Sequence, residues 1–537
     1  MRMRGFLITK KTAFVLAVLL ILGASVLGAQ EDFFQAQEQP QEVSEPEIIV
    51  DTGQPLFVIA AFEFDITGRT RPDALIRAGE FRIGEELNGE ENLRAFIRDR
   101  TQLLINQRVL QETIVITYRI GERQADGAYP VTLEIMVEDS WNFIILPIPR
   151  YSTNTGLEVI LRIRDYNFLG TMNPLSIDLG YHFDENQRHS FNFGLESNTP
   201  FNAFGLHWNF RFAALFSYRP DTDEPFHFRN VTGLSVEVPL RTTTFTFGFE
   251  ESFHLNEENL NRHIPNYGEF QSGFFMSSRM FAEWEIPTGL HVSRFGELTY
   301  TPEVSATFNH EFSRWPLQDI RRGPFLDFGH TLWFERIDWR GNFREGISFS
   351  VSNMYRYDFF RQRNNRDPLS VSYTVSGIGH LVVSRFFGIS SRLMFRHWFY
   401  HDPAYNDMAA DAIRGITDTS LSANYMLSLN LNFPLRLPLF SPARWFNNER
   451  LRALDIEFHL SPLLDLALYN DPQNGTTFDI DNLIAGGGLE LMVFPLAMRN
   501  LYIRLSFAWN LGEVRTRPFR LPGGYDREIT IMMGHFF

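Results

Sequence analysis

The sequence predicts a mainly β protein: an antiparallel transmembrane β-barrel of sixteen strands, with eighteen as the alternative count, preceded by one small α+β domain. Aromatic residues make up 15% of the chain and charged residues 21%, a mixture that suits strands with one face in lipid and one in water. Apolar and polar residues alternate over segments of nine to fifteen residues, long enough for tilted membrane strands and longer than most soluble ones. The connections alternate between short and long, as in bacterial barrels.

The first 54 residues are interpreted as targeting and linker sequence. Four basic residues precede an apolar run from Ala13 to Leu27, and the small residues Gly28 and Ala29 follow. This order is typical of a secretory signal peptide, and the run is shorter than the roughly twenty apolar residues of a membrane helix. Residues 1–29 are therefore predicted to be a signal peptide and residues 30–54, rich in Gln, Glu and Pro, a flexible leader.

Residues 55–140 are predicted to form the α+β domain. An apolar run at 56–66 predicts a strand, and helical periodicity follows at 72–77 and 91–107. Two further strands are expected at 109–120 and 129–137. The expected order is β-α-α-β-β.

From Trp141 to Phe537 the period is two, which places successive side chains on opposite faces of a strand. Near the end, for example, apolar and more polar residues alternate from Leu501 to Asn510. Eighteen such segments can be counted, and two of them could be halves of split strands. An even number is needed for both ends of the barrel to lie on one side of the membrane.

Charge, cysteine content and the absence of enzyme motifs limit the classes of function that the sequence allows. The formal net charge is −15, which argues against nucleic-acid binding because such proteins carry basic faces. The chain has no cysteine, so an exported form depends on a large core or a closed sheet rather than on disulfides. No H-E-x-x-H, G-x-S-x-G or P-loop pattern occurs, so we expect no enzyme, no cofactor and no metal site.

Three stretches resemble one family, the BamA/TamA-like outer-membrane assembly and translocation barrels, which include the two-partner secretion transporters. Asp165-Tyr166-Asn167-Phe168-Leu169-Gly170 is similar to the family's D-x-N-[FW]-L-G turn between the second and third barrel strands. Ile413-Arg414-Gly415-Ile416 resembles its [VI]-R-G-[FY] loop tip. The last nine residues, with Gly534 and Phe537, resemble a C-terminal insertion signal. The three stretches occur in the family's order.

The resemblance implies that residues 55–140 are a polypeptide-transport-associated (POTRA) domain in the periplasm of a double-membraned bacterium. It implies insertion or translocation of β-rich polypeptides at the outer membrane. The implied partners are unfolded outer-membrane or secreted polypeptides, the lipid bilayer, and periplasmic chaperones or accessory lipoproteins, with no nucleic acid. Two departures are a single POTRA domain, where BamA-type factors usually carry several, and Ile416, where the family has an aromatic residue.

Two alternative functions stay open. One is a two-partner-type secretion pore for a dedicated exported protein, and the other is a structural or passive diffusion barrel. In the assembly function, a weakly bonded seam between the first strand (near Trp141–Tyr151) and the last (Ile529–Phe537) would open and template new strands. The edge of the POTRA sheet would pair with a substrate strand.

By resemblance, Arg414 is expected to fold into the lumen and pair with a carboxylate on its wall. Between Ala453 and Asp465 the even positions are apolar, whereas Asp455, Glu457 and Asp465 share the other face. A guanidinium in a partly desolvated interior needs such a partner. Asp465 and Glu457 are the candidates, and the alternative is that these acids only hydrate a polar lumen.

Overall fold

The computed structural model describes residues 55–125, 127–152, 156–183, 189–258, 270–292, 296–399, 407–408, 412–416, 422–423, 425–470, 482–512 and 527–533. The predicted signal peptide, the leader, and Gly534 and Phe537 lie outside the described residues. Residues 56–537 form one compact unit that comprises an N-terminal domain and a barrel.

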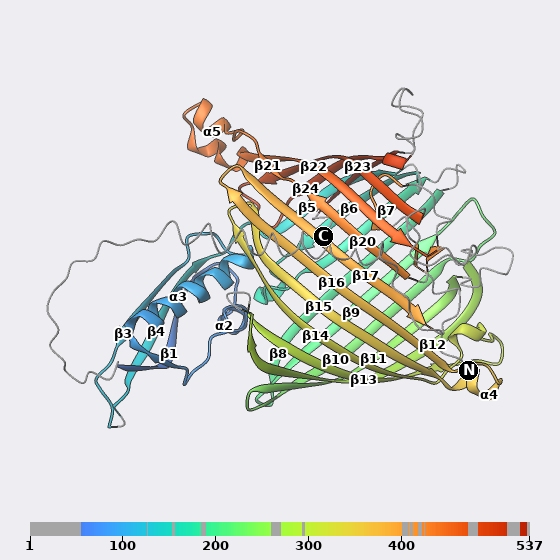
Figure 1. Ribbon diagram of the computed structural model, residues 1–537, viewed down its shortest axis with the longest axis horizontal. Helices are drawn as coiled ribbons and strands as arrows, with labels where there is room; N and C mark the ends of the chain where they lie inside the picture. Colours follow the sequence, from blue (N-terminus) through green and yellow to red (C-terminus); the bar gives the residue numbers. More distant parts are fainter. Residues whose placement is uncertain are drawn as a thin grey trace, which may run out of the picture. The chain divides into compact units, whose positions relative to one another are not determined.

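The N-terminal domain consists of a four-stranded sheet and two helices (Figure 1). In chain order its elements are β1 (Leu56–Thr67), α2 (Pro72–Ala78), β2 (Glu86–Asn88), α3 (Gly89–Asn106), β3 (Val115–Ile120) and β4 (Tyr129–Glu138). The sheet order is β2-β1-β4-β3, in which β1 and β4 run parallel and the other pairs antiparallel. No helix in the described part of the chain is long and apolar enough to cross a membrane.

Local sequence explains these elements. α2 has Pro72 at its first position, Asp73 in its first turn and Arg77 in its last, which suits the helix dipole. α3 buries Leu93 and Leu104 against the sheet, with eleven further buried apolar residues in one core. The core explains most of the free energy that holds the domain together, because burial of apolar area dominates folding.

Two expectations for this domain were wrong in detail. The short strand β2 was missed because three residues are too few to show a period of two. The third strand was predicted from residue 109 but begins at Val115. Val109, Leu110 and Ile114 are buried core residues outside this strand, and Leu110 forms only an isolated antiparallel bridge with Asp139.

The remaining chain forms a closed antiparallel barrel from β5 to β25. Two short segments, β20 (Tyr425–Asn432) and β21 (Leu435–Arg436), pair with the same two neighbours and form one strand of the wall interrupted at residues 433–434. Counted this way, the barrel has eighteen strands in the described residues. The alternative count of eighteen is confirmed, and sixteen was wrong.

The other strands are, in order, β5 (Phe143–Ser152), β6 (Gly156–Asp165), β7 (Leu175–Phe183), β8 (His189–Ala203), β9 (Leu206–Tyr218), β10 (His227–Leu240), β11 (Thr243–Glu258), β12 (Phe270–His291), β13 (Glu297–His310), β14 (Phe325–Arg340), β15 (Phe343–Asp358), β16 (Leu369–Ser384), β17 (Phe387–Phe399), β22 (Ile456–Tyr469), β23 (Leu483–Pro495), β24 (Ile503–Asn510) and β25 (Arg527–Met533).

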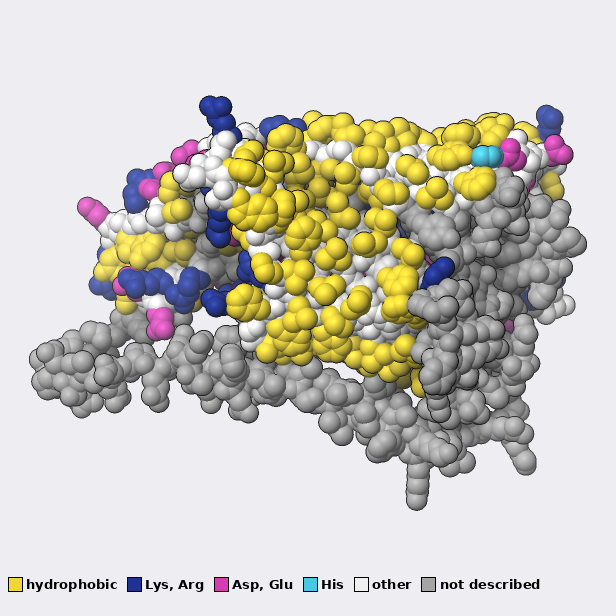
Figure 2. Space-filling model, turned by 90° about the horizontal axis from the view of Figure 1, so that it is seen from above, with side chains coloured by type: hydrophobic (Ala, Val, Ile, Leu, Met, Phe, Trp, Pro, Cys, Tyr) yellow, Lys and Arg dark blue, Asp and Glu magenta, His cyan; other side chains and the backbone are white. Residues whose placement is uncertain are grey.

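The two faces of the wall differ, as a transmembrane barrel requires. Phe247 and Phe249 on β11 and Met280 on β12 are 40–51% exposed on the outer face. On the alternate positions of the same strands, Glu250 and Arg279 form an ion pair. Figure 2 shows apolar side chains covering the part of the wall that faces the viewer, where charged side chains are sparse.

The chain passes from the N-terminal domain into β5 at one end of the barrel, which is here called the domain end. Several connections at this end are two-residue turns, such as Phe204-Gly205, where both residues have positive φ; this is the hairpin geometry that matches strand twist. The connection between β21 and β22 is an exception. It runs from residue 437 to 455 and contains α5 (Pro442–Trp445) and the 3-10 helix η6 (Glu449–Leu454).

Candidate functional site

The turn between β6 and β7 packs against the N-terminal domain. Its backbone is left-handed at Leu169 (φ 54°) and Gly170 (φ 74°). The amide of Arg71 donates to the carbonyl of Gly170 over 2.9 Å. A Cβ on Gly170 would lie 2.1 Å from the carbonyl oxygen of Arg69. Glycine is therefore required here both for its conformation and for the close approach of the domain.

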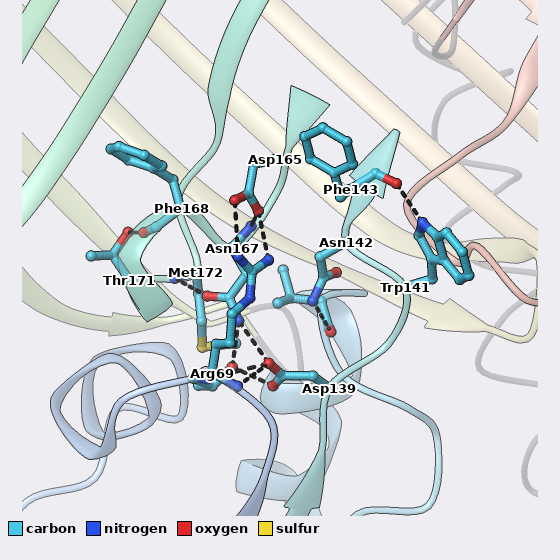
Figure 3. A network of polar contacts seen from close by, with 12 residues as sticks. Arg69, Asp139, Trp141, Asn142, Phe143, Asp165, Asn167, Phe168, Thr171 and Met172 are labelled. Atoms are coloured by element: carbon cyan, nitrogen blue, oxygen red, sulfur yellow. Dashed lines mark hydrogen bonds and ion pairs between the residues drawn. The ribbon is translucent and has the colours of Figure 1, made fainter. Parts of the chain in front are cut away.

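Asn167 is the buried centre of this contact (Figure 3). Its side-chain amide donates to Thr70 Oγ1 over 2.7 Å and to Asp139 Oδ2 over 3.1 Å. Its Oδ1 accepts from the backbone amide of Met172 over 3.0 Å. Both donors and the acceptor of the buried Asn167 side chain thus have partners. Two of these partners, Thr70 and Asp139, precede the barrel in the chain.

The other residues of the turn make more exposed or more local contacts. Asp165 faces the guanidinium of Arg69 as a two-pronged pair at 3.1 and 3.2 Å, although the Arg69 side chain is 59% exposed. The amide of Phe168 donates to the carbonyl of Asn173 over 3.1 Å, which closes the turn. Leu169 is 62% exposed. Of the predicted turn residues, Asn167 and Gly170 make the closest contact with the domain.

The domain also contacts three other barrel hairpins near their turns, those formed by β8 and β9, β14 and β15, and β23 and β24. The contacts join Arg77 to His207 at 2.8 Å, Asn106 to Asp338 at 2.8 Å and Arg499 to Glu112 at 2.7 Å. These hairpins are spread around the ring of strands. The domain is therefore held at several points of the barrel's domain end.

Arg108 is the most buried cation at this contact, at 5% exposure. It donates to the carbonyl of Arg499 and, over 3.1 Å, to Asn342 Oδ1, and its guanidinium lies 4.0 Å from the ring centre of Trp339. Burial lowers the pKa of Arg108 to about 10. Neutral acceptors and an aromatic face, which interact well with a planar guanidinium, surround this charge.

The stretch Ala412–Ile416, which contains Ile413, Arg414 and Gly415, lies against the inner face of the barrel wall. Ile413 and Ile416 are 2% and 3% exposed and belong to one apolar cluster with Ala467 and Met426. Ile416 therefore supplies apolar contact at the position where the resembling family has an aromatic ring.

Among the described residues, three wall residues accept five hydrogen bonds from Arg414, which is 3% exposed. Its Nε and Nη2 donate to the two oxygens of Asp465 over 2.8 and 2.7 Å, and its backbone amide donates to the same carboxylate over 3.0 Å. Nη1 donates to Glu490 Oε2 over 3.1 Å, and Nη2 donates to Asn432 Oδ1 over 2.7 Å. Such a bidentate, buried arrangement is among the strongest that a carboxylate can form.

The structure brings Arg414 to one of its two predicted partners and not to the other. Glu457 instead contacts Arg436 and, over 2.8 Å, the Nε2 of His459. It lies eight residues before Asp465 on β22, too far along the strand to reach the same guanidinium. In the part of the chain that the structure describes, no cluster of His, Asp and Glu has the arrangement of a metal site.

Sequence analysis missed Glu490, the second carboxylate of this site. Glu490 is fully buried, and Arg504 approaches it at 3.5 Å as a second guanidinium. Gly486, on the same strand, makes room for the stretch, since a Cβ there would lie 1.9 Å from the carbonyl oxygen of Arg414. A glutamate flanked by two leucines, just after three consecutive glycines, was the signal that could have identified this residue.

The barrel closes between β25 and β5, and the sequence of β5 weakens that closure. The amide of Tyr166 donates to the carbonyl of Asn142, and these two residues directly precede and follow the paired residues Phe143 and Asp165, so they continue the same register. Hydrogen-bonded pairs alternate along an antiparallel ladder. The backbone N–H and C=O groups of even-numbered β5 residues therefore bond to β6, and those of odd-numbered residues point toward β25. Pro147 and Pro149 are odd-numbered. The seam therefore lacks two backbone donors of β5.

Comparison with known proteins finds solved structures at low identity and low TM-score. No protein-family model matches the chain, and no curated protein matches it. Among solved structures, BamA from Haemophilus ducreyi lacking POTRA domains 1–3 is 12% identical, with 88% of this chain and 83% of that chain covered and a TM-score of 0.37. CdiB from Acinetobacter baumannii is 12% identical (89% and 74% covered, TM-score 0.45), and CdiB from Escherichia coli 11% (99% and 99%, 0.38). At these values the likenesses say nothing of function, which rests on the chain's own residues.

Proposed function

We propose that this chain is an outer-membrane protein of the BamA/TamA-like assembly and translocation family, and that it inserts or translocates β-rich polypeptides. The observation that carries this proposal is the seam. Pro147 and Pro149 turn their missing donors toward β25, of which seven residues are described. Each absent backbone pair removes about 0.5–1.5 kcal/mol of net stability, so the barrel would open more readily here than between fully bonded strands.

An open seam would present two unpaired strand edges at the level of the membrane. Unpaired edges template further strands, which in a membrane must be fully hydrogen-bonded. A substrate hairpin would add to β5 or β25 and then leave as its own barrel closes. No nucleotide is needed for this step, because backbone pairing and apolar burial supply the free energy.

The N-terminal domain would deliver the substrate. Its sheet ends at β3, whose one neighbour among the described strands is β4. Val115 and Ile120 at the two ends of β3 are each 46% exposed. An exposed edge with apolar side chains suits pairing with an extended polypeptide. The contacts of Asn167 and Arg108 would hold this edge in a fixed relation to the barrel.

The Arg414 site favours this function over a passive diffusion barrel. A buried network of Arg414, Asp465, Glu490 and Asn432 occupies the inner face of the wall, and its net charge with Arg504 is zero. Its role would be to brace the strands β20, β22 and β23, which lie close to the seam in strand order. Bracing these strands would matter for a barrel whose seam opens, whereas a passive diffusion barrel keeps its seam closed.

Reconstitution tests the proposal. The full-length mature chain is placed in liposomes, and a urea-unfolded eight-stranded outer-membrane barrel is added from the side of the N-terminal domain. We expect the substrate to gain heat-modifiable gel migration and protease resistance faster than in empty liposomes or in liposomes that hold a porin. A soluble β-rich passenger that crosses while the barrel substrate stays unfolded would instead indicate a secretion pore. Steady conductance without effect on either substrate would contradict the proposal.

A further inference from the structure

The connection 437–455, here called the rim segment, is a folded structure at the domain end of the barrel. In Figure 1, α5 lies beyond the ends of β21 and β22. The amide of Leu496 donates to the carbonyl of Asp455 over 3.0 Å, and Arg499 in the same turn donates to the carbonyl of Leu110 in the N-terminal domain. The rim segment is therefore on the same side of the membrane as that domain.

Apolar side chains of the rim segment are exposed rather than buried. Trp445 is 62% exposed, Phe446 71% and Leu454 55%. Leu437 and Phe440 are also exposed, at 38% and 40%. The apolar surface starts directly after Leu435, which is 41% exposed on the outer face of β21, so it continues the lipid-facing wall.

The same segment carries three arginines that have no acidic partner among the described residues. Arg444, Arg450 and Arg452 lie on α5 and η6. No described Asp or Glu lies in ion-pair range of any of them, whereas the nearby Arg436 is paired with Glu457. Three guanidiniums without a described acidic partner, next to exposed Trp and Phe side chains, form the composition of an interfacial membrane segment.

Short-range contacts hold the segment in shape. Ser441 caps α5 by accepting from the amide of Arg444 over 3.3 Å, and Asn448 accepts from the amide of Arg450 over 3.0 Å. The rings of Phe440 and Trp445 meet edge to face with centres 4.7 Å apart. The exposed side chains are thus presented by an ordered structure, which lowers the entropy lost on binding.

We propose that the rim segment binds the membrane leaflet on the side of the N-terminal domain. Trp445, Phe446 and Leu454 enter the boundary between headgroups and acyl chains, and the three arginines bind phospholipid phosphates. Guanidiniums form two-pronged hydrogen bonds with phosphate, and aromatic side chains concentrate at the membrane–water interface. The partner is a lipid surface rather than a protein, because the exposed residues continue the lipid-facing wall without a polar break at Leu435 and Leu437.

This binding would anchor one side of the domain end close to the seam. The rim segment precedes β22, which is three strands before β25. Since it contacts the turn that Arg499 ties to the domain, the lipid contact would also fix the domain relative to the membrane plane. Binding at the rim can be tested independently of whether the chain assembles other proteins.

The absence of cysteine makes a depth measurement direct. A spin label is attached to the single-cysteine variant F446C of the full mature chain in liposomes of phosphatidylethanolamine and phosphatidylglycerol. L489C on the outer face of β23 and I83C in the N-terminal domain, exposed by 46% and 70%, are the lipid and water references. We expect F446C, like L489C, to be relaxed by oxygen and protected from a water-soluble nickel chelate.

Two results would overturn the proposal. Access of the nickel chelate to F446C equal to that of I83C would place the rim segment in water. Protection from both reagents, in detergent as well as in liposomes, would mean that protein covers it.

Binding of lipid headgroups by the three arginines is tested separately. We expect the spin label of F446C to lie deeper in liposomes that contain phosphatidylglycerol than in liposomes of neutral phosphatidylcholine. Adding R444Q/R450Q/R452Q to F446C should abolish this difference in depth. R385Q, on the two-residue turn between β16 and β17 at the same end, should leave that difference unchanged. An undiminished lipid dependence in the triple variant would refute headgroup binding by these arginines. Heat-modifiable migration confirms that each variant has folded.

Discussion

At the scale of single residues, two buried polar side chains organise the protein at different levels. Asn167 joins the barrel to the N-terminal domain, and Arg414 joins a loop to the wall. Both are almost completely buried, and both have their polar atoms satisfied. Removing one partner from such a group leaves the other desolvated and unpaired, which costs more than the intact bond contributes.

Replacing Arg414 with alanine should destabilise the wall by about 3–5 kcal/mol, because two buried carboxylates lose a guanidinium partner. Lysine should restore little, since a point charge cannot reproduce the two-pronged contact with Asp465. Double-mutant cycles in urea unfolding should show strong coupling of R414A with D465A and with E490A. E457A is the control and should be additive with R414A; additivity with D465A would contradict this account of the site.

Replacing Asn167 with alanine should weaken the contact between the N-terminal domain and the barrel by roughly 1–3 kcal/mol of free energy, because Thr70 and Asp139 lose a buried donor. Hydrogen exchange of residues 68–72 and 165–172 measures the effect. Arg69→Ala is the matched control: it removes the exposed pair with Asp165, which contributes little. Equal protection in N167A and the wild-type chain would show that the turn does not hold the domain.

At the scale of elements, β5 differs from the other strands in its two prolines on the seam side. Proline within a strand is tolerated where its missing donor faces no partner. In a closed barrel every strand has two neighbours, so Pro147 and Pro149 leave acceptors on β25 without donors from β5. The first strand therefore has the chemistry of an edge strand although it stands in a closed wall.

Restoring the donors with P147V/P149V should slow opening of the seam. We expect slower hydrogen exchange over residues 527–533 of β25 and slower substrate insertion in the liposome assay. P302V, which makes the same change on β13 away from the seam, should leave both rates unchanged. Faster exchange of β25 in the double valine variant would contradict the assignment of these prolines to the seam.

At the scale of the whole molecule, the barrel was predictable because its period of two persists over almost 400 residues, from Trp141 onward. Asp465 could be placed on the inner face for the same reason. Glu490 could not be paired with Arg414 from sequence, because strand register brings it to that site from a different strand, 76 residues away. The rim segment was also beyond prediction, since its apolar residues follow no period and their exposure depends on the fold.

In the proposed mechanism the barrel opens between β5 and β25, and a locked seam tests this opening most directly. Cysteines are paired between position 145 of β5 and position 529 or 531 of β25 in the cysteine-free chain, and the pair that oxidises efficiently is used. S350C/S376C, whose residues are direct partners across β15 and β16, provides an equally locked control elsewhere in the wall. We predict that oxidation of the seam pair stops insertion of the unfolded barrel substrate, that reduction restores it, and that the control pair has no effect. Undiminished insertion with the seam fully oxidised would contradict the claim.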